Sequence, residues 1–230
     1  MKMEVLADAE AVAQRAAELV ATEARAAAEA RGRFSLALSG GHTPWRMLRI
    51  LADQEVPWRA LHLFQVDERV APAGHADRNL THIDESLLAH VRLLPEQVHA
   101  MPVQEPDLAA GAARYARELE AVCGVPPVLD LVHLGLGPDG HTASLVPGDP
   151  VLEITDAQVA VTGAYQSRVR LTLTYPALER ARALLWLVTG ADKAAMLARL
   201  RAGDRAIPAG RVRSERALIL ADRAAASGER

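Results

Sequence analysis

Short apolar runs alternate along the chain with longer stretches whose apolar residues recur at helical spacing. Continuous apolar runs of about four to eight residues are typical of strands buried on both faces of a sheet. They predict strands at 34–38 (FSLAL), 61–66 (LHLFQV), 129–134 (LDLVHL) and 184–189 (LLWLVT), with shorter ones at 159–161, 169–173 and 217–220.

The stretches between these runs predict helices. Residues 9–30 are rich in Ala, Glu and Arg, which favour helix, and they place Val12, Ala16 and Val20 on one face. Gly32 then follows as a typical helix end. Further helices are predicted at 44–52, 79–90, 107–123 and 192–201, and the tail at 224–230 is expected to fray.

The alternation of strand and helix predicts an α/β fold with a mostly parallel sheet. The chain has 230 residues, enough for one large domain with its own core. No linker, repeat or low-complexity stretch divides it. We therefore expect a single domain over residues 1–230.

Composition narrows the classes of function. Hydrophobic residues make up 50% of the chain, which argues against disorder, and a net charge of −3 argues against general binding to nucleic acid or anionic membranes. The N-terminal MKMEVLADAE lacks the apolar core of a signal peptide, and no apolar run approaches the length of a membrane span. The single cysteine, Cys123, excludes an intramolecular disulfide and suits the reducing cytoplasm, where we expect the protein.

Ligands of open α/β sheets bind beyond the carboxyl ends of the strands, so the loops that follow the strands indicate the site. The first such loop is 39–44 (SGGHTP). Gly40 and Gly41 let several backbone N–H groups converge, and the next helix adds its positive N-terminal end, so the loop suits a phosphate. Ser39 and Thr43 are candidate hydroxyl donors. An ordinary turn between strand and helix explains the two glycines equally well, and no Walker A sequence is present.

The loop after the strand at 129–134 runs GLGPDGHT at 135–142. It matches the G-x-G-x-x-G spacing of dinucleotide sites, but Asp139 would set a carboxylate against the pyrophosphate. A carboxylate and an imidazole two residues apart remain, on a glycine-rich loop at a strand end. Because histidine is the usual general base at neutral pH and a carboxylate can orient it, His141 and Asp139 are the candidate catalytic pair. The alternative is a turn with an exposed histidine.

The third junction is 66–70 (VDERV), in which three charged residues directly follow an apolar strand. Arg69 suits a phosphate, and Asp67 and Glu68 suit proton transfer or the holding of that arginine. A solvated loop is equally compatible with this segment.

Three more cations are candidate phosphate ligands. Arg168 and Arg170 flank Val169 at the start of a predicted strand, so that one pleat face would carry both. Lys193 lies in the first turn of the helix at 192–201. A cation there is unfavourable because it opposes the helix dipole, and a bound anion beside it would compensate. Outward-facing arginines and an ordinary surface lysine are the alternatives.

Other residues have no clear chemical role. His75, Asp77 and His82 have only generic spacing for a metal, and we expect no metal site there. Cys123, at a predicted helix end, and His133, in an apolar strand, are expected to be structural.

Taken together, the loops resemble the motifs of the 6-phosphogluconolactonase family. Residues 39–44 resemble that family's S-G-G-S-T-P loop, and 67–70 with 75–79 resemble its D-E-R-x-V and D-S-N stretches. Residues 134–148 (LGLGPDGHTASLVPG) are similar to its most specific signature, L-G-x-G-x-D-G-H-T-A-S-L-F-P-G. Residues 168–174 (RVRLTLT) resemble its R-I-T-L-T strand, and the match runs in order over about residues 5 to 225.

The resemblance implies hydrolysis of 6-phospho-D-glucono-1,5-lactone to 6-phospho-D-gluconate in the oxidative pentose phosphate pathway, without a metal or organic cofactor. It implies a Rossmann-like sheet with helices on both faces, as in glucosamine-6-phosphate deaminase and ribose-5-phosphate isomerase. The loop at 39–43, Arg69 and Arg168 would hold the 6-phosphate. His141 would take a proton from the attacking water, and Asp139 would orient it. Backbone N–H groups near 40–41 or 137 would stabilise the oxyanion, and we expect a monomer or a small homo-oligomer.

The sequence departs from the family pattern at several positions. His42 replaces the usual serine of the first loop, which removes a hydroxyl donor and adds an imidazole. Arg78 stands where a serine is usual, and Val146 replaces phenylalanine. The strand at 217–220 lacks the aromatic residues common there. None of these changes touches His141, Asp139 or Arg69.

Three alternatives to the lactonase remain open: a glucosamine-6-phosphate deaminase, a sugar-phosphate sensor and a non-catalytic member of the same family. Glucosamine-6-phosphate deaminases also carry D-G-H, but there an I-A-F-N-E-P stretch follows, whose glutamate joins the proton relay. Here residues 142–145 are TASL, with no acid before Asp149. A sugar-phosphate sensor would carry a DNA-binding module, for which a chain that opens on one long helix leaves no room.

Overall fold

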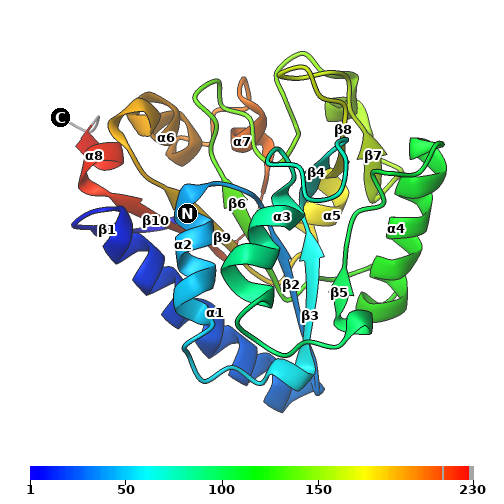
Figure 1. Cartoon of the computed structure of the whole chain (residues 1–230). Coiled ribbons are helices and arrows are strands. Elements are labelled where there is room, and N and C mark those ends of the chain that lie inside the picture. Colours follow the sequence, from blue (N-terminus) through cyan, green and yellow to red (C-terminus); the bar gives the residue numbers. More distant parts are fainter. Residues whose placement is uncertain (214, 228–230) are drawn as a thin grey trace.

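The computed structural model describes residues 1–213 and 215–227. A seven-stranded sheet, with the strand order β1-β10-β9-β6-β2-β3-β5, forms its centre, and each neighbouring pair is parallel (Figure 1). A three-stranded antiparallel sheet, β4-β8-β7, lies beside it. The strands are β1 (Lys2–Leu6), β2 (Phe34–Leu38), β3 (Leu61–Gln65), β4 (Asp67–Arg69), β5 (Val98–His99), β6 (Leu131–Gly135), β7 (Val159–Val161), β8 (Arg170–Leu173), β9 (Leu184–Val188) and β10 (Ala217–Asp222).

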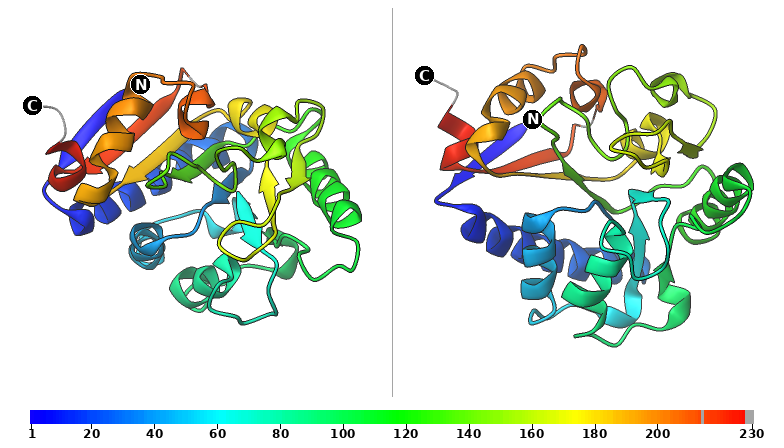
Figure 2. Two further views of the ribbon diagram at one scale, coloured as in Figure 1. Left: turned by 90° about the horizontal axis from the view of Figure 1, so that it is seen from above. Right: turned by 45° about the horizontal axis from the view of Figure 1, so that its top comes forward.

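Helices cover both faces of the large sheet, as predicted. Buried residues of α1, α2 and α3 join one apolar cluster, and those of α4 to α8 join another on the opposite face (Figure 2). The helices are α1 (Ala9–Arg31), α2 (His42–Leu51), α3 (Asn79–Ile83), α4 (Leu108–Cys123), α5 (Tyr175–Glu179), α6 (Ala194–Arg201), α7 (Pro208–Arg211) and α8 (Arg223–Ala226). Among the described helices, none combines the length and apolarity that a membrane crossing requires.

The first helix shows how the sequence sets these elements. Asp8 accepts a hydrogen bond from the backbone N–H of Ala11, and Gly32 ends the helix with a left-handed φ of 70°. The buried face is built largely from alanines, so the helix packs closely against the sheet. The prediction of a long helix ending at Gly32 is confirmed.

Several elements differ from the prediction. β1 is an additional strand, and it mixes charged and apolar residues because it is an edge strand that is half exposed. Residues 67–69 form the short strand β4, paired with β8, and Glu68 is fully buried, so the alternative of a solvated loop is wrong. The helix predicted from 44 begins at His42, and the one predicted at 79–90 is α3 followed by a π-helical turn at Asp84–Leu88.

The C-terminal tail is also better ordered than predicted. Asp222 accepts a hydrogen bond from the backbone N–H of Ala225 and so caps α8. Helix α8 therefore covers part of the stretch expected to fray, and residues 228–230 lie outside the described residues.

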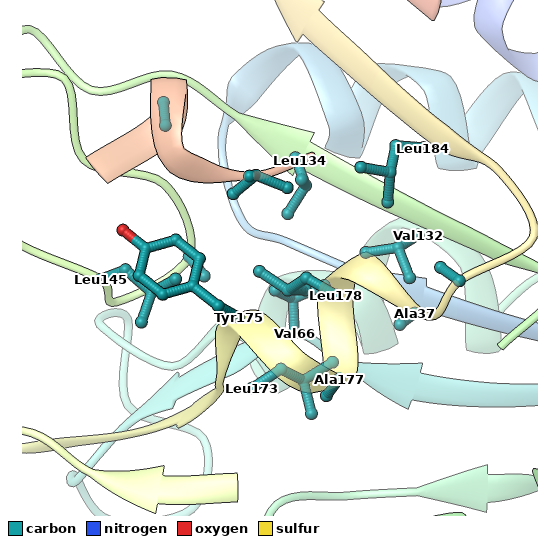
Figure 3. Close-up of a cluster of buried hydrophobic side chains, with 14 of the residues drawn as sticks. Ala37, Val66, Val132, Leu134, Leu145, Leu173, Tyr175, Ala177, Leu178 and Leu184 are labelled. Carbon is teal, nitrogen blue, oxygen red and sulfur yellow. The ribbon is translucent and has the colours of Figure 1, made fainter. Parts of the chain in front are cut away.

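The apolar core on the α4-to-α8 side holds the centre of the sheet in place (Figure 3). Val132 and Leu134 of β6 pack there with Tyr175 and Leu178 of α5. Leu131 belongs to the opposite cluster, because successive residues of a strand point to opposite faces. Both faces of β6 are thus fixed, and the loop that follows it starts from a rigid base.

The strand order reverses between β2 and β6. From β2 the chain continues to β3 and β5 on one side, and from β6 it continues to β9 and β10 on the other. The loops that leave two such strands diverge and open a crevice at the carboxyl edge of the sheet. The residues after Leu38 and Gly135 therefore meet at the switch point of the sheet.

Candidate active site

A cavity of about 340 Å³ lies at this switch point, beyond the carboxyl ends of β2, β6 and β9. Its size is that of a small-molecule site. All predicted site residues line it except Glu68, Asp139 and Arg168. The lining consists of residues 39–44, 135–138 and 187–189 with Asp67, Arg69, Asn79, His133, His141, Ala143, Arg170 and Lys193.

Hydrogen bonds to His133 of β6 fix the start of the loop at 39–44. The backbone N–H of Ser39 donates to Nδ1 of His133 at 3.3 Å, and its hydroxyl donates to the backbone carbonyl of His133 at 3.1 Å. The hydroxyl of Thr43 forms a 2.8 Å hydrogen bond with that of Thr189. The predicted hydroxyl donors therefore already have protein partners, and they fix the shape of the loop.

Gly41 turns the chain into α2 with a φ of 129°, which disfavours residues with a side chain. No side chain caps the N-terminus of α2. The first N–H groups of this ten-residue helix therefore have no side-chain acceptor at the cavity wall, where they suit an anion. His42 is exposed on the same loop, with its ring centroid 5.0 Å from that of Trp45.

The charged residues after β3 divide into two kinds. Glu68 is fully buried and accepts hydrogen bonds from the backbone N–H groups of Arg69, Asn79 and Leu80. Its carboxylate therefore holds the start of α3. Asp67 is 4% exposed and accepts a 2.6 Å hydrogen bond from the hydroxyl of Ser144, so it joins β4 to the loop after β6.

Arg78, at the position where the family pattern has serine, lies against the carboxylate of Glu68. Its Nε is 3.1 Å from Oε2 of Glu68, and both side chains are almost completely buried. The ion pair compensates the buried carboxylate, which would be costly to leave alone.

Three cations surround the cavity. Arg69 donates from Nη1 to the backbone carbonyl of Asp77 at 2.7 Å, and its Nε is buried without a protein partner. Arg170 is 3% exposed, and its Nε also lacks a protein partner. Burial lowers the pKa of Arg170. Lys193 lies in a short 3-10 turn, Ala191–Lys193, directly before α6, where it pairs with Asp192 at 3.0 Å.

The prediction that Arg168 and Arg170 share a pleat face is wrong. β8 begins at Arg170, and Arg168 precedes it in a turn with left-handed φ values at Gln166 and Ser167. Arg168 forms an ion pair with Asp77 at 2.8 Å outside the cavity lining. The sequence did contain the signal, since Arg170 directly precedes the L-T-L-T of the strand motif.

His141 and Asp139 form a close pair at the edge of the cavity. Nδ1 of His141 lies 2.5 Å from Oδ1 of Asp139, which also accepts the backbone N–H of His141 at 3.1 Å. Burial acts to raise the pKa of Asp139, but hydrogen bonds from His141 and Tyr165 outweigh it, so the pKa lies below its ordinary value. The ionised carboxylate suits the tautomer in which it accepts a hydrogen bond from Nδ1–H, which would leave the lone pair of Nε2 available as a base.

The glycines of this loop have specific steric roles. A Cβ at Gly137 would lie 2.0 Å from Nδ1 of His141. Gly140 has a φ of 83°, and a Cβ there would meet Ile207 at 2.6 Å. The N–H of Gly137 donates to the carbonyl of His141 at 2.8 Å, so this predicted oxyanion donor already has a partner.

Sequence reasoning missed several residues of the site. Asn79 is 1% exposed, lines the cavity, and donates to the carbonyl of Asp67 at 2.9 Å. His133 was expected to be structural, and it is fully buried, but it also lines the cavity. Tyr165 donates to Oδ2 of Asp139 at 3.0 Å across 26 residues, a contact that no motif signals.

The described residues contain no cluster of three or more His, Cys, Asp or Glu side chains arranged to hold a metal. Nδ1 of His75 accepts the N–H of Asp77, and His82 stacks on Trp45 with ring centroids 3.9 Å apart. Cys123 is 5% exposed in a core cluster, in agreement with a structural role.

The parallel sheet, the cavity at its switch point and the cations beside a histidine–carboxylate pair define a class of α/β proteins that bind small anionic ligands at a sheet edge. A family model described as Glucosamine-6-phosphate isomerases/6-phosphogluconolactonase matches residues 7–220. The chain is 35% identical to the 6-phosphogluconolactonase of a Nostoc species, over 99% of this chain and 97% of that protein. It is 38% identical to that of Streptomyces coelicolor, over 96% and 91%. The chain belongs to this family.

Solved structures agree with this assignment. The structure of 6-phosphogluconolactonase from Thermotoga maritima superposes with a TM-score of 0.85 at 28% identity, covering 96% of this chain and 98% of that one. The enzyme from Trypanosoma brucei gives 0.86 at 27% identity, covering 100% and 98%. A monomeric glucosamine-6-phosphate deaminase gives 0.86 at 20% identity, covering 100% of both chains, which shows a shared fold alone.

Proposed function

We propose that this protein is a carboxylic ester hydrolase that opens 6-phospho-D-glucono-1,5-lactone to 6-phospho-D-gluconate, the second step of the oxidative pentose phosphate pathway. The observation that carries the proposal is that His141 and three cations line one cavity. A base and cations in one cavity suit a substrate that carries both a reactive carbonyl and a phosphate. The names of the relatives support the same substrate class.

The cations and the start of α2 would hold the 6-phosphate. Arg69, Arg170 and Lys193 supply positive charge, and the first backbone N–H groups of α2 supply donors. Because the phosphate does not react, its binding energy serves to orient the lactone carbonyl. Asp67 would help to place Asn79 and Ser144 at this end of the cavity.

His141 would act as general base and then as general acid. Nε2 takes a proton from water as the water oxygen bonds to the carbonyl carbon of the lactone. The tetrahedral intermediate then collapses, the bond from that carbon to the ring oxygen breaks, and the imidazolium returns its proton to the ring oxygen. Asp139 would hold the tautomer that these steps need, with the proton on Nδ1, and would stabilise the imidazolium.

The oxyanion of the intermediate requires N–H donors. Gly137 donates its N–H to His141 within the loop, which leaves the segment at 40–41 as the better-placed candidate. The segment at 40–41 could serve both groups only if the phosphate and the oxyanion lay on opposite sides of it. We therefore assign this segment to the oxyanion and the start of α2 to the phosphate.

Deaminase activity is less well supported. Among the described residues that line the cavity, Asp67 is the one acid, and the hydroxyl of Ser144 already donates to it. The loop continues as TASL at 142–145, without the glutamate that the deaminase relay uses.

The test is hydrolysis of the lactone, made in situ from glucose 6-phosphate by its dehydrogenase, measured above the enzyme-free rate. Ammonia release from glucosamine 6-phosphate is measured on the same preparation. Fast lactone opening without ammonia supports the proposal. Ammonia without lactone opening would replace it with the deaminase, and binding of gluconate 6-phosphate without either activity would replace it with a sensor.

We further propose that residues 1–230 act as one domain in the cytoplasm, as a monomer or small homo-oligomer, without a metal or organic cofactor. The core on both faces of one sheet supports the single domain. The buried, unpaired Cys123 is compatible with a reducing compartment. Gel filtration with light scattering measures the oligomeric state, and activity that survives EDTA is the expected result for the metal.

A further inference from the structure

Asp139 is held by a residue that lies outside the cavity. One of its carboxylate oxygens, Oδ1, faces Nδ1 of His141, and the other, Oδ2, accepts a 3.0 Å hydrogen bond from the hydroxyl of Tyr165. The rings of Tyr165 and His141 also meet edge to face, with centroids 5.3 Å apart. Tyr165 therefore touches both members of the pair without lining the cavity.

The turn that carries Tyr165 is built to hold it there. Tyr165 and Arg168 exchange backbone hydrogen bonds of 2.9 and 3.2 Å around Gln166 and Ser167, both of which have left-handed φ values. Residues with a side chain rarely adopt this backbone region, so contacts with other parts of the chain must stabilise the turn. The ion pair of Arg168 with Asp77 is one such contact.

Arg170 supports the tyrosine from its other side. Its guanidinium carbon lies 5.0 Å from the centroid of the Tyr165 ring, and Nη2 donates to the carbonyl of Tyr165 at 3.4 Å. Arg170 lines the cavity, so the tyrosine is placed between a candidate phosphate ligand and the catalytic pair.

We propose that Tyr165 is a positioning residue for the His141–Asp139 pair, an inference that rests on the proposed function of that pair. The phenol donates to Oδ2, which fixes the rotation of the carboxylate and reserves Oδ1 for the Nδ1 proton of His141. The lone pair of Nε2 then stays directed for proton transfer. The hydroxyl remains a donor, because burial and Asp139 raise the pKa of Tyr165.

The hydrogen bond also sets the basicity of the pair. A donor to Oδ2 draws negative charge away from the carboxylate, so Asp139 stabilises the imidazolium of His141 less than a free carboxylate would. Loss of the phenol makes Asp139 a stronger partner for the imidazolium. The acidic limb of the profile of kcat against pH should then move upward.

The structure contains a closely matched control tyrosine. Tyr175 donates its hydroxyl to the carbonyl of Pro208 at 3.0 Å, and the guanidinium carbon of Arg211 lies 5.0 Å from its ring centroid. Tyr175 is 8% exposed and does not line the cavity. Tyr175→Phe therefore removes a similar hydrogen bond away from the catalytic pair.

The experiment compares Tyr165→Phe, Tyr175→Phe and the unmodified protein. In Tyr165→Phe we expect kcat to fall roughly 10-fold, KM to stay within about twofold, and the acidic limb to move upward. Tyr175→Phe should leave all three unchanged. Equal losses in both variants, or an unmoved pH profile in Tyr165→Phe, would overturn the proposal.

A second measurement separates this inference from the proposed function. The imidazole ring protons of His141, identified by their loss in His141→Asn, are followed by NMR against pH without substrate. An upward shift in Tyr165→Phe supports the positioning role even if the protein opens no lactone. An unchanged titration overturns it whatever the protein catalyses.

Discussion

Gly137 lies directly against His141, so closely that a Cβ at residue 137 would be 2.0 Å from Nδ1 of the imidazole. The backbone conformation of Gly137 does not itself require glycine, because its φ is outside the left-handed region. An alanine at residue 137 therefore tests the contact with His141 alone. Gly137→Ala should fold normally and yet displace the imidazole from Asp139. We expect kcat to fall about 100-fold or more, since a misplaced base loses most of its effect.

The measurement is kcat for lactone opening together with the thermal midpoint of unfolding. A large fall in kcat with a thermal midpoint close to that of the unmodified protein supports the steric role of Gly137. Full activity in Gly137→Ala would show that His141 does not act from the position it has here.

His141 itself should carry general base catalysis. His141→Asn removes the base and keeps a polar side chain of similar size, so kcat should fall by roughly 10² to 10⁴, with KM little changed. A smaller fall would place the base elsewhere. Because His141 is partly exposed and outside the two core clusters, the thermal midpoint should hardly change.

Arg170 and Arg168 allow a paired test of the phosphate site. Arg170 lines the cavity, whereas Arg168 pairs with Asp77 outside it. Arg170→Met should raise KM for the phosphorylated lactone about 10- to 100-fold, the effect of a lost charge-assisted hydrogen bond. Arg168→Met should raise it far less.

The non-phosphorylated gluconolactone serves as the control substrate for both variants. Its kcat/KM should fall far less in Arg170→Met than that of the phosphorylated lactone, since it has no phosphate to lose and only the support of Tyr165 by Arg170 is removed. If Arg168→Met were the variant that discriminates between the two substrates, the phosphate would bind at the outer ion pair.

The sequence predicted the position of the site because of one property of parallel sheets. Apolar runs mark the strands, parallel strands end at one edge, and so the loops at 39–44 and 135–142 had to lie near each other. The charged segment at 67–69 was harder to interpret. A fully buried Glu68 looks like a solvated residue in a hydrophobicity pattern, although backbone N–H groups satisfy it.

No sequence motif signals the contact of Tyr165 with the candidate catalytic pair. Tyr165 contacts Asp139 from a turn in which Gln166 and Ser167 adopt left-handed conformations. Glycine or asparagine usually announces such a turn, and neither is present here. The turn is imposed by contacts with segments distant in the chain, such as Arg168 with Asp77, which local propensity does not contain.

His133 leads to a prediction about stability and pH. Burial lowers its pKa to about 3, far below the ordinary value of about 6.5. Between these two values the unfolded chain binds a proton that the folded chain does not. The contribution of neutral His133 to stability is therefore complete above pH ~6.5 and is lost as pH falls, by about 1.4 kcal/mol per pH unit.

His133→Leu separates this effect from the rest of the acid response. At pH 7.5 the variant should be less stable by roughly 1–3 kcal/mol, because the N–H of Ser39 loses its acceptor. As pH falls to 4.5 the gap between the two proteins should close, since only the unmodified protein has the buried imidazole to protonate. Urea unfolding at both pH values measures the gap.

The exposed His90 provides the control for this measurement. His90→Gln should unfold in parallel with the unmodified protein at both pH values. A gap for His133→Leu that stayed constant from pH 7.5 to 4.5 would mean that His133 takes up its proton in the folded state, and the loop at 39–44 would then rest on a charged imidazole, which could not accept the N–H of Ser39.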